Sequence, residues 1–298
     1  MPNPLVKRHP LYYVRYWDRY LKRLVFPVLP SHRPDFLIIG AQKAATTSLY
    51  NYLNQLPGIC GAGNKEIYYF DREQNFGRND RWYHSHFKAF SKSQLFFEAT
   101  PNYFYYPWVP RKIYEYNPHL KLVVVLRNPV SRAFSAWNMY KDFFDRNELY
   151  RFQKGLRPSD ENFIFKYFYE GRNSFPAFEE CLDIELDLMD RMPDIPEPAL
   201  LRRGLYSEQI ERYYAYFSMD QIYFVGYREL VNNPQYVVAN IYSWLFSDSG
   251  HPVCFETPKR NPGTYNSKMK KDTEERLIGF FKNEYEKVCS LIGRRVEW

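Results

Sequence analysis

No stretch of this 298-residue sequence is a long hydrophobic run, and cysteine is scarce. A helix that spans a membrane needs ~18–20 apolar residues, and the end at Met1 has no apolar segment typical of a signal peptide. The four cysteines, at positions 60, 181, 254 and 289, lie far apart and form no Cys-x-x-Cys pair. Zinc knuckles and a dense disulfide framework are therefore not expected. We expect a cytoplasmic protein in a reducing compartment.

The composition is that of a soluble globular protein with an excess of positive charge. Apolar residues make up 45% and charged residues 25%, which excludes intrinsic disorder and collagen-like repeats. The net charge of +7 favours anionic partners such as nucleotides, sulfated ligands or a membrane surface. The basic residues are scattered and match no RNA-recognition, zinc-finger or basic-arm motif, so no nucleic-acid partner is expected.

Residues 1–34 form an N-terminal extension rich in basic and aromatic residues. Every fourth position from 12 to 24 is aromatic or apolar, which predicts one face of a helix with Tyr12, Tyr16, Tyr20 and Leu24. One interpretation is a helix that packs this face on the main domain. The other is an interfacial helix within residues 1–30 that contacts anionic lipid or a partner protein.

The remaining residues, 35–298, alternate short apolar runs with amphipathic segments. Runs such as DFLIIG are typical of buried parallel strands. The pattern predicts one α/β domain, with a central parallel sheet flanked by helices on both faces. Residues 141–200 are irregular, and we expect them to form a helical elaboration on the substrate side. The predicted strands are 35–40, 120–127 and 221–227, and the predicted helices are 44–56, one from Pro129, 234–246 and a last one from Asp272 with a capping box to Glu275.

The segment LIIGAQKAATTSL is typical of a phosphate-binding loop. A strand ends at Gly40, and small residues then open a helix whose N-terminal N–H groups can approach a phosphate. Lys43 supplies a full positive charge, and the hydroxyls of Thr46, Thr47 and Ser48 can donate hydrogen bonds. The ATP and GTP pattern GxxxxGK[ST] is not met. Lys43 follows Gly40 by only three residues, and the residue directly before Lys43 is not glycine. The alternative is an ordinary strand–helix turn.

A second segment, LRNPVSRAFSAW, begins where another buried strand ends. An unpaired charge at Arg127 is costly there, and Asn128-Pro129 are typical of a helix N-terminus. Ser131 and Ser135 lie four residues apart on one helical face. Arg127 and Ser135 are spaced to clamp a second phosphate at the carboxyl edge of the sheet, where open α/β sheets bind ligands. The alternative is a capped helix with a structural pair between Arg127 and a carboxylate.

These two segments resemble the phosphate motifs of the sulfotransferases that use 3′-phosphoadenosine 5′-phosphosulfate (PAPS). The nearest resemblance is to the heparan-sulfate branch, and it covers most of the chain, from about residue 34 to about residue 293. Six motifs follow the order of the family. They are GAQKAATTSL (40–49), NKEIYYFD (64–71), FEATPNYF (97–104), RNPVSRAFS (127–135), the stretch that begins RGLYSEQ (203–230) and NPGTYNSKM (261–269).

The resemblance implies a P-loop-like three-layer fold. It also implies transfer of a sulfuryl group from PAPS to a hydroxyl or amine of an acceptor, first of all a saccharide or glycoconjugate, with PAP as the product. Glu66 is then the catalytic base, and Lys43 stabilises the leaving phosphate without a metal. The residues expected to bind the donor are Gly40, Gln42, Lys43, Ala44, Ala45, Thr46, Thr47, Ser48, Arg127, Ser135, Tyr206, Arg260, Gly263, Thr264 and Tyr265.

The sequence departs from the family pattern in two motifs. Ala99 follows Glu98 where the heparan-sulfate enzymes usually carry lysine, so a cation near the substrate or the sulfate is missing or comes from elsewhere. Lys259-Arg260 lie upstream of Gly263 instead of in the usual order, and Cys254 has no evident partner nearby. These departures weaken the assignment of the acceptor more than that of the donor.

The assignment of the base leaves alternatives open. One alternative is that Lys65 and Glu66 are solvated surface charges. The other residues that could serve as the base are His84, His86 and His119. No carboxylate lies at a convincing metal-ligand spacing from His84 and His86, so a metal site is not expected.

Two other functions compete with sulfuryl transfer. One is a P-loop-type nucleotide-dependent kinase, although the predicted strands 120–127 and 221–227 end in no carboxylate for Mg²⁺. The other is a non-catalytic protein that binds PAP or a sulfated glycan. Most of the many aromatic residues are expected in the core, but those at 103–106 and 167–169 are suited to stack on a sugar or an aromatic acceptor.

Overall fold

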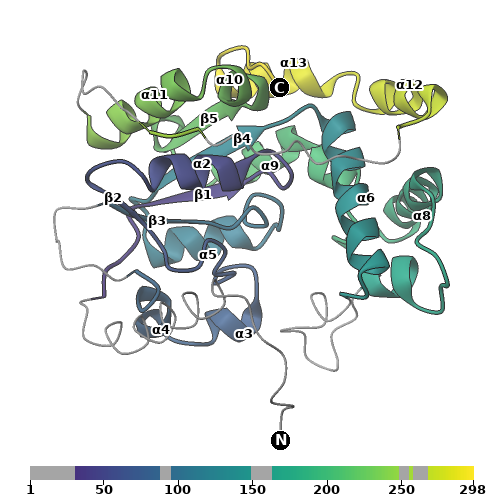
Figure 1. The fold of residues 1–298 in the computed structure, drawn as a ribbon, viewed down its shortest axis with the longest axis horizontal. Helices are drawn as coiled ribbons and strands as arrows, with labels where there is room; N and C mark the ends of the chain where they lie inside the picture. The colour runs from purple at the N-terminus through teal and green to yellow at the C-terminus, as the bar shows by residue number, and fades with distance from the viewer. Residues whose placement is uncertain (1–30, 88–94, 149–162, 248–254, 258–267) are drawn as a thin grey trace, which may run out of the picture.

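A parallel sheet between two layers of helices forms the centre of this chain (Figure 1). The structure is a computed structural model, and it describes residues 31–87, 95–148, 163–247, 255–257 and 268–298. The helix expected in residues 1–30 lies outside this part of the chain. The predicted α/β fold class is confirmed.

The sheet has five parallel strands in the order β2-β3-β1-β4-β5. Phe36 at the start of β1 pairs with Phe97 of one neighbouring strand and with Lys121 of the other. Leu122 of β4 pairs with Ile222 of β5, the strand at the edge of the sheet. The strands are β1 (Phe36–Gly40), β2 (Ile59–Gly61), β3 (Leu95–Ala99), β4 (Lys121–Leu126) and β5 (Ile222–Gly226).

The three predicted strands are confirmed as β1, β4 and β5. All of β1 and nearly all of β4 are buried, because helices cover both faces of a parallel sheet. The sequence did not predict β2 and β3. Strand β2 has only three residues, and the sequence of β3, LFFEA, includes the charged Glu98. Pairing with the rest of the sheet makes these two segments strands, and that contribution cannot be seen in a local pattern.

Helices cover both faces of the sheet. Helix α2 (Thr46–Leu53) follows β1 and packs with α11 (Pro234–Phe246) on one face. Crossover connections between parallel strands are right-handed. The connection from β3 to β4 runs across the sheet in the opposite direction to the connection from β1 to β2, which contains α2. Helix α5 (Val109–Tyr116), in the β3–β4 connection, therefore lies on the face opposite α2. The other helices are α3 (Glu73–Phe76), α4 (Asp80–His84), α6 (Pro129–Asp145), α8 (Phe178–Arg191), α9 (Tyr206–Tyr214), α10 (Tyr227–Asn232), α12 (Lys271–Phe280) and α13 (Glu284–Ile292).

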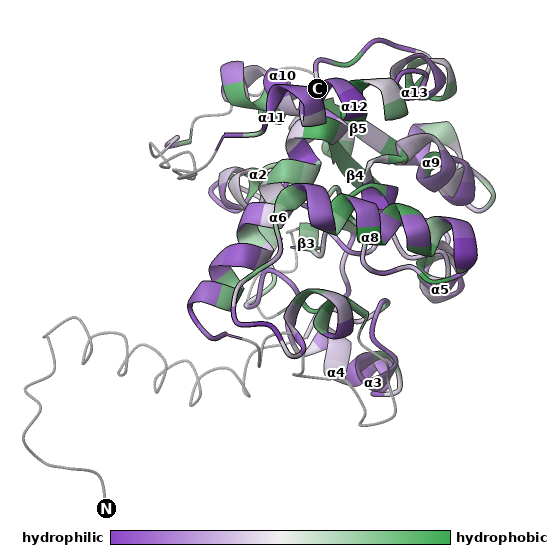
Figure 2. Cartoon of the chain, turned by 90° about the vertical axis from the view of Figure 1, so that its right-hand side faces the viewer, coloured by the Kyte–Doolittle hydropathy of each residue, from purple (hydrophilic) through white to green (hydrophobic). Residues whose placement is uncertain are grey.

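Helix α6 contributes to the second of two hydrophobic cores. It begins as predicted, with the Asn128 side chain accepting a hydrogen bond from the Ser131 N–H at 3.1 Å. The first core surrounds the sheet, and the second lies between α6, α8 and α12 and includes Trp137 and Phe178. In Figure 2 the strands are mostly hydrophobic, whereas the helices are striped with hydrophilic residues. The described part of 141–200 is thus largely helical, while its place on the substrate side stays a prediction.

The prediction of one last helix capped by Asp272 is wrong. The described chain forms two helices, α12 and α13, and the residue before α12 is Lys270, without a side-chain capping bond. The interruption lets Phe281 pack into the second core while α13 turns toward α9. There the buried Glu284 carboxylate accepts the Ser207 N–H at 2.5 Å. These long-range contacts override the continuous apolar stripe of the sequence.

The C-terminal segment after α13 closes over the end of β5. The Arg228 N–H donates to the Glu297 carbonyl at 2.9 Å, and the Glu297 N–H donates to the Glu229 carboxylate at 3.0 Å. A Cβ at Gly226 would lie 2.3 Å from the same Glu297 carbonyl oxygen. The close approach of the two backbones therefore requires glycine at this position.

We expect Gly226→Ala to lower the free energy of unfolding by about 1–3 kcal/mol, because backbone must move to admit the methyl group. Urea denaturation measures this change. The matched control is Gly279→Ala in α12, where among the described residues no atom beyond the adjoining backbone of the helix and its chain neighbours lies within 4 Å of the added Cβ. There the higher helix propensity of alanine should raise stability by up to about 1 kcal/mol. Equal effects of the two substitutions would contradict the close approach.

Candidate active site

The loop between β1 and α2 holds two residues in the left-handed region. Lys43 and Ala45 have φ angles of 67° and 63°. Side chains make this conformation unfavourable, and such outliers concentrate at functional sites. Among the described residues, the N–H groups of Lys43 and Ala45 donate to no partner. The loop therefore offers free N–H donors and the positive end of α2 to an anion.

Lys43 lies among other cations. Burial lowers the pKa of Lys43, and the charges of Arg127 and Arg132 lower it further. The Arg132 side chain is fully buried, and its Nη2 donates to the Leu200 carbonyl. Its Nε and Nη1 atoms have no hydrogen-bond partner in the described structure. An anion bound at the loop would relieve the repulsion between these charges.

Arg127 follows β4 and is fixed by uncharged groups. One guanidinium nitrogen donates to the Lys43 carbonyl at 2.7 Å, and the group lies 4.6 Å from the centroid of the Tyr227 ring. The Tyr206 hydroxyl donates to the Arg127 carbonyl at 2.7 Å. Within the described residues no carboxylate pairs with Arg127. This part of the structure therefore does not contain the structural ion pair that was the alternative interpretation of Arg127. The arrangement brings together three predicted donor-site residues.

The two serines of α6 differ in their surroundings. Ser131, not Ser135, contacts the guanidinium, with its Oγ accepting from Arg127 Nε at 3.3 Å. Ser135 lies one turn further along the helix and is 1% exposed. A role for Ser135 at the second phosphate stays a prediction.

The predicted base lies beside the first turn of α2. Lys65 Nζ donates to Glu66 Oε1 at 2.7 Å and lies 3.5 Å from Thr46 Oγ1. Glu66 is 33% exposed, so its carboxylate is accessible to an acceptor. The Lys65 carbonyl also accepts the Ala99 N–H at 2.9 Å. The Lys65 backbone is therefore paired with the position where the family usually has lysine.

Glu98 holds the segment that carries Glu66, and sequence analysis did not assign it a role. Its buried carboxylate accepts hydrogen bonds from the hydroxyls of Tyr83 and Tyr103, both at 2.8 Å. It also accepts from Thr100 at 2.5 Å and from the Ile67 N–H at 3.2 Å. Burial raises the pKa of Glu98 to about 7. The signal in the sequence was a glutamate inside the otherwise apolar run LFFEA.

The other predicted residues of the loop are packed as a close turn. A Cβ at Gly40 would lie 2.5 Å from the Phe104 Cβ, so glycine is required there. Ala44 and Thr46 are buried, while Thr47 is exposed. Gln42 and Ser48 are half-buried. Four predicted donor-site residues lie outside the described chain, namely Arg260, Gly263, Thr264 and Tyr265.

The two neighbouring histidines have structural partners. His84 Nε2 lies 2.8 Å from the Tyr116 hydroxyl, and His86 Nδ1 lies 3.3 Å from the Trp82 carbonyl. Burial lowers the pKa of both. Within the described residues, no group of three or more histidines, cysteines or acidic residues is arranged to hold a metal.

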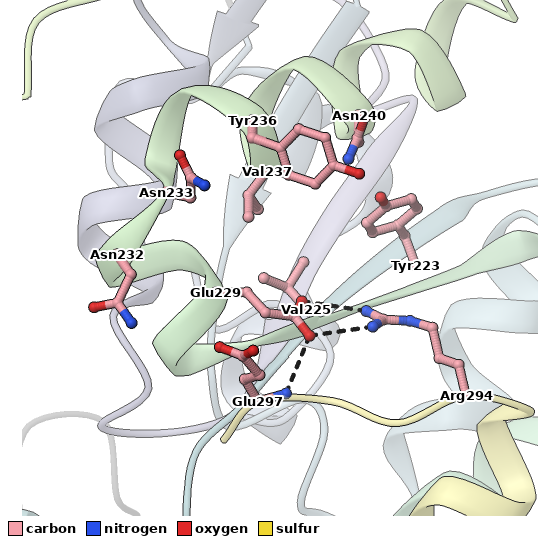
Figure 3. Close-up of a pocket in the computed structure, with 10 residues that line it drawn as sticks. All are labelled: Tyr223, Val225, Glu229, Asn232, Asn233, Tyr236, Val237, Asn240, Arg294 and Glu297. Carbon is pink, nitrogen blue, oxygen red and sulfur yellow. Dashed lines mark hydrogen bonds and ion pairs between the residues drawn. The ribbon is translucent and has the colours of Figure 1, made fainter.

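A separate cavity of about 450 Å³ lies beside β5, α10, α11 and the C-terminal segment (Figure 3). An ion pair between Glu229 and Arg294, with an N–O distance of 3.2 Å, forms part of its wall, and Tyr236 borders it from α11. None of the predicted site residues lines this cavity. The candidate site is thus defined by the charges and free donors after β1 and β4.

Comparison with known proteins establishes the family. Residues 33–282 match the model of the sulfotransferase domain, so this chain belongs to the sulfotransferase family. Its fold is similar to that of a sulfotransferase from Alicyclobacillus acidocaldarius, with 25% identity and a TM-score of 0.64, over 89% of this chain and 98% of that one. The recognition of the family and of its fold is confirmed.

Two curated relatives extend the comparison. The membrane-associated sulfotransferase kil1 of Dictyostelium discoideum is 24% identical over 89% of this chain and 66% of its own length. Heparan sulfate glucosamine 3-O-sulfotransferase 5 of Homo sapiens is 26% identical over 67% of this chain and 50% of its own length. The matches therefore span between half and about two thirds of these relatives. None of the described helices is long and apolar enough to cross a membrane.

The pKa of Glu98 gives a prediction on stability. Because burial raises this pKa to about 7 from 4.5, the stability that Glu98 contributes is full below pH 4.5 and is lost as the pH rises through 7. We expect Glu98→Gln to remove up to about 3 kcal/mol of that pH dependence. Urea titrations between pH 4.5 and 8 measure it. The control Glu115→Gln, at an exposed carboxylate of α5, should keep the wild-type slope, and a wild-type slope in both variants would refute the prediction.

Proposed function

We propose that this chain transfers a sulfuryl group from PAPS to a hydroxyl or amine of an acceptor, and that the acceptor is a saccharide or glycoconjugate. The observation that carries the proposal is the arrangement of Lys43, Arg127 and Glu66. The Arg127 guanidinium donates to the backbone carbonyl of Lys43, and Lys65 bridges Glu66 to the first turn of α2. Membership of the sulfotransferase family supports this reaction type.

The residues present fit the donor. PAPS, when bound, supplies the sulfuryl group, and PAP is the product. The donor carries two anionic phosphates, at its 5′ and 3′ positions. Lys43 and the free N–H groups of its loop would hold the 5′-phosphate and stabilise the charge that grows on it. Arg127 would bind the 3′-phosphate, with Tyr206 orienting its backbone. The unpartnered nitrogens of the buried Arg132 add positive potential at the same place.

Glu66 is proposed as the base that accepts the proton of the acceptor. A positioned carboxylate contributes ~10²–10⁴-fold to such a step. The ammonium of Lys65 lies between this carboxylate and Thr46, and the Lys65 backbone carbonyl accepts the Ala99 N–H. We propose that Lys65 supplies the cation for which the family usually uses the lysine at position 99.

The acceptor class and the domain organisation are also proposals. The printed names of heparan sulfate relatives support a saccharide acceptor. The match to residues 33–282 supports one sulfotransferase domain over 35–298. We also propose that 141–200 lie on the substrate side. The name of the membrane-associated relative supports a peripheral membrane contact, for which the basic and aromatic residues 1–30 are proposed.

Two alternatives are less well supported. A kinase needs a carboxylate at the end of a strand for Mg²⁺, but β1, β4 and β5 end in Gly40, Leu126 and Gly226. The carboxylate near the end of β3, on Glu98, is enclosed by four hydrogen-bond donors. A non-catalytic PAP-binding protein has no need for an accessible Glu66, which makes turnover the deciding measurement.

PAP should raise the thermal midpoint of the protein in the presence of EDTA, because the site supplies its own positive charge. Ligand at ~100 times its Kd adds about 2.7 kcal/mol to stability. Arg127→Ala should abolish most of the shift, whereas the control Arg146→Ala, at an exposed residue after α6, should keep it. A shift with ATP and Mg²⁺ but none with PAP would favour the kinase.

Glu66→Gln should lower turnover about 10²-fold or more while leaving PAP affinity unchanged, since it keeps the shape and removes the basicity. The assay uses radiolabelled PAPS and the best acceptor from a panel of saccharides. Glu73→Gln is the matched control, because this exposed carboxylate pairs only with Lys112 among the described residues. Near-normal turnover of Glu66→Gln would move the base to His84 or His86.

A further inference from the structure

Tyr68 has a left-handed backbone two residues after Glu66. Its φ angle is 56°, a conformation that is uncommon for a bulky side chain. Thr100 stabilises it, with its Oγ1 accepting the N–H groups of Ile67 at 3.2 Å and Tyr68 at 3.4 Å. The turn at Tyr68 directs its side chain back along the chain, toward Glu66.

The Tyr68 hydroxyl donates a hydrogen bond to Glu66 Oε2. Lys65 Nζ donates to the other oxygen, Oε1, at 2.7 Å. Each carboxylate oxygen therefore has one donor that fixes it, and each keeps a lone pair for an incoming proton donor. Tyr68 and Lys65 together set the orientation of the carboxylate.

The phenol of Tyr68 is a permanent donor. Burial raises its pKa well above the ordinary value, and the neighbouring Glu66 charge raises it further. The ring is also held in place, because the Arg72 guanidinium lies 3.9 Å from its centroid. Tyr68 therefore stays protonated and oriented while Glu66 gains or loses a proton.

We propose that Tyr68 is a positioning residue for Glu66, and this inference rests on the proposed function of Glu66 as the base. Its hydroxyl holds one carboxylate oxygen so that the other faces the acceptor proton. Loss of the hydroxyl leaves that oxygen without its donor and the carboxylate free to turn.

Tyr68→Phe in the full chain tests the proposal. We expect kcat to fall about 10-fold with the PAP-induced thermal shift unchanged. The matched control is Tyr69→Phe. It removes the same atom from the next residue, where the hydroxyl donates to Asp80 at 2.9 Å instead. Tyr69→Phe should leave kcat close to that of the wild type.

The double variant separates positioning from general packing. If Tyr68 acts through Glu66, then Tyr68→Phe should not slow Glu66→Gln any further. Slowing by the same factor as in the wild type would assign Tyr68 a structural role and overturn the proposal. A wild-type kcat for Tyr68→Phe beside a slow Glu66→Gln overturns the positioning role alone. Normal turnover of Glu66→Gln overturns the base assignment and this proposal with it.

Discussion

The buried carboxylate of Glu98 is the constraint on which the candidate site depends. A carboxylate removed from water is unfavourable unless protein donors replace the water. Here the donors come from three different segments, through Tyr83, Ile67 and the Thr100–Tyr103 stretch. The contacts that compensate the buried charge therefore also fix the segment of Glu66 against the end of β3. One set of hydrogen bonds therefore both offsets the cost of burying Glu98 and places the proposed base Glu66.

Arg127 follows a complementary principle. A carboxylate partner would fix its guanidinium equally well but would cancel its charge. The structure instead uses the Lys43 carbonyl, the Ser131 hydroxyl and the Tyr227 ring, which orient the group and leave its positive potential intact. Glu98 and Arg127 thus show the two ways in which this fold treats charge. One charge is fully enclosed to organise structure, and the other is held ready for an anion.

The sequence predicted those parts that depend on local pattern. The runs 35–40 and 120–127 are buried strands, and Asn128 caps α6 as expected. The sequence did not predict β2 and β3, because the strand character of these segments comes from pairing with the sheet. It also did not predict the break between α12 and α13, which follows from packing on α9 and the second core. Within the site, a family motif indicated Glu66 and Lys43. The contacts of Glu98, Arg132 and Tyr68 join distant residues or depend on a backbone reversal, so no spacing rule indicates them.

The contacts between distant segments also determine when the site can exist. Arg127 bonds to Lys43 across 84 positions of the sequence and receives the Tyr206 bond across 79. The Tyr206 ring in turn packs against Trp298, with 5.8 Å between ring centroids. A parallel sheet already requires pairing of segments far apart, which makes folding slow. During synthesis, the N-terminal half can form its loop and helices, but it contains neither Tyr206 nor β5. The complete candidate site therefore forms only after segments from both halves of the chain have come together, which makes it a late product of folding.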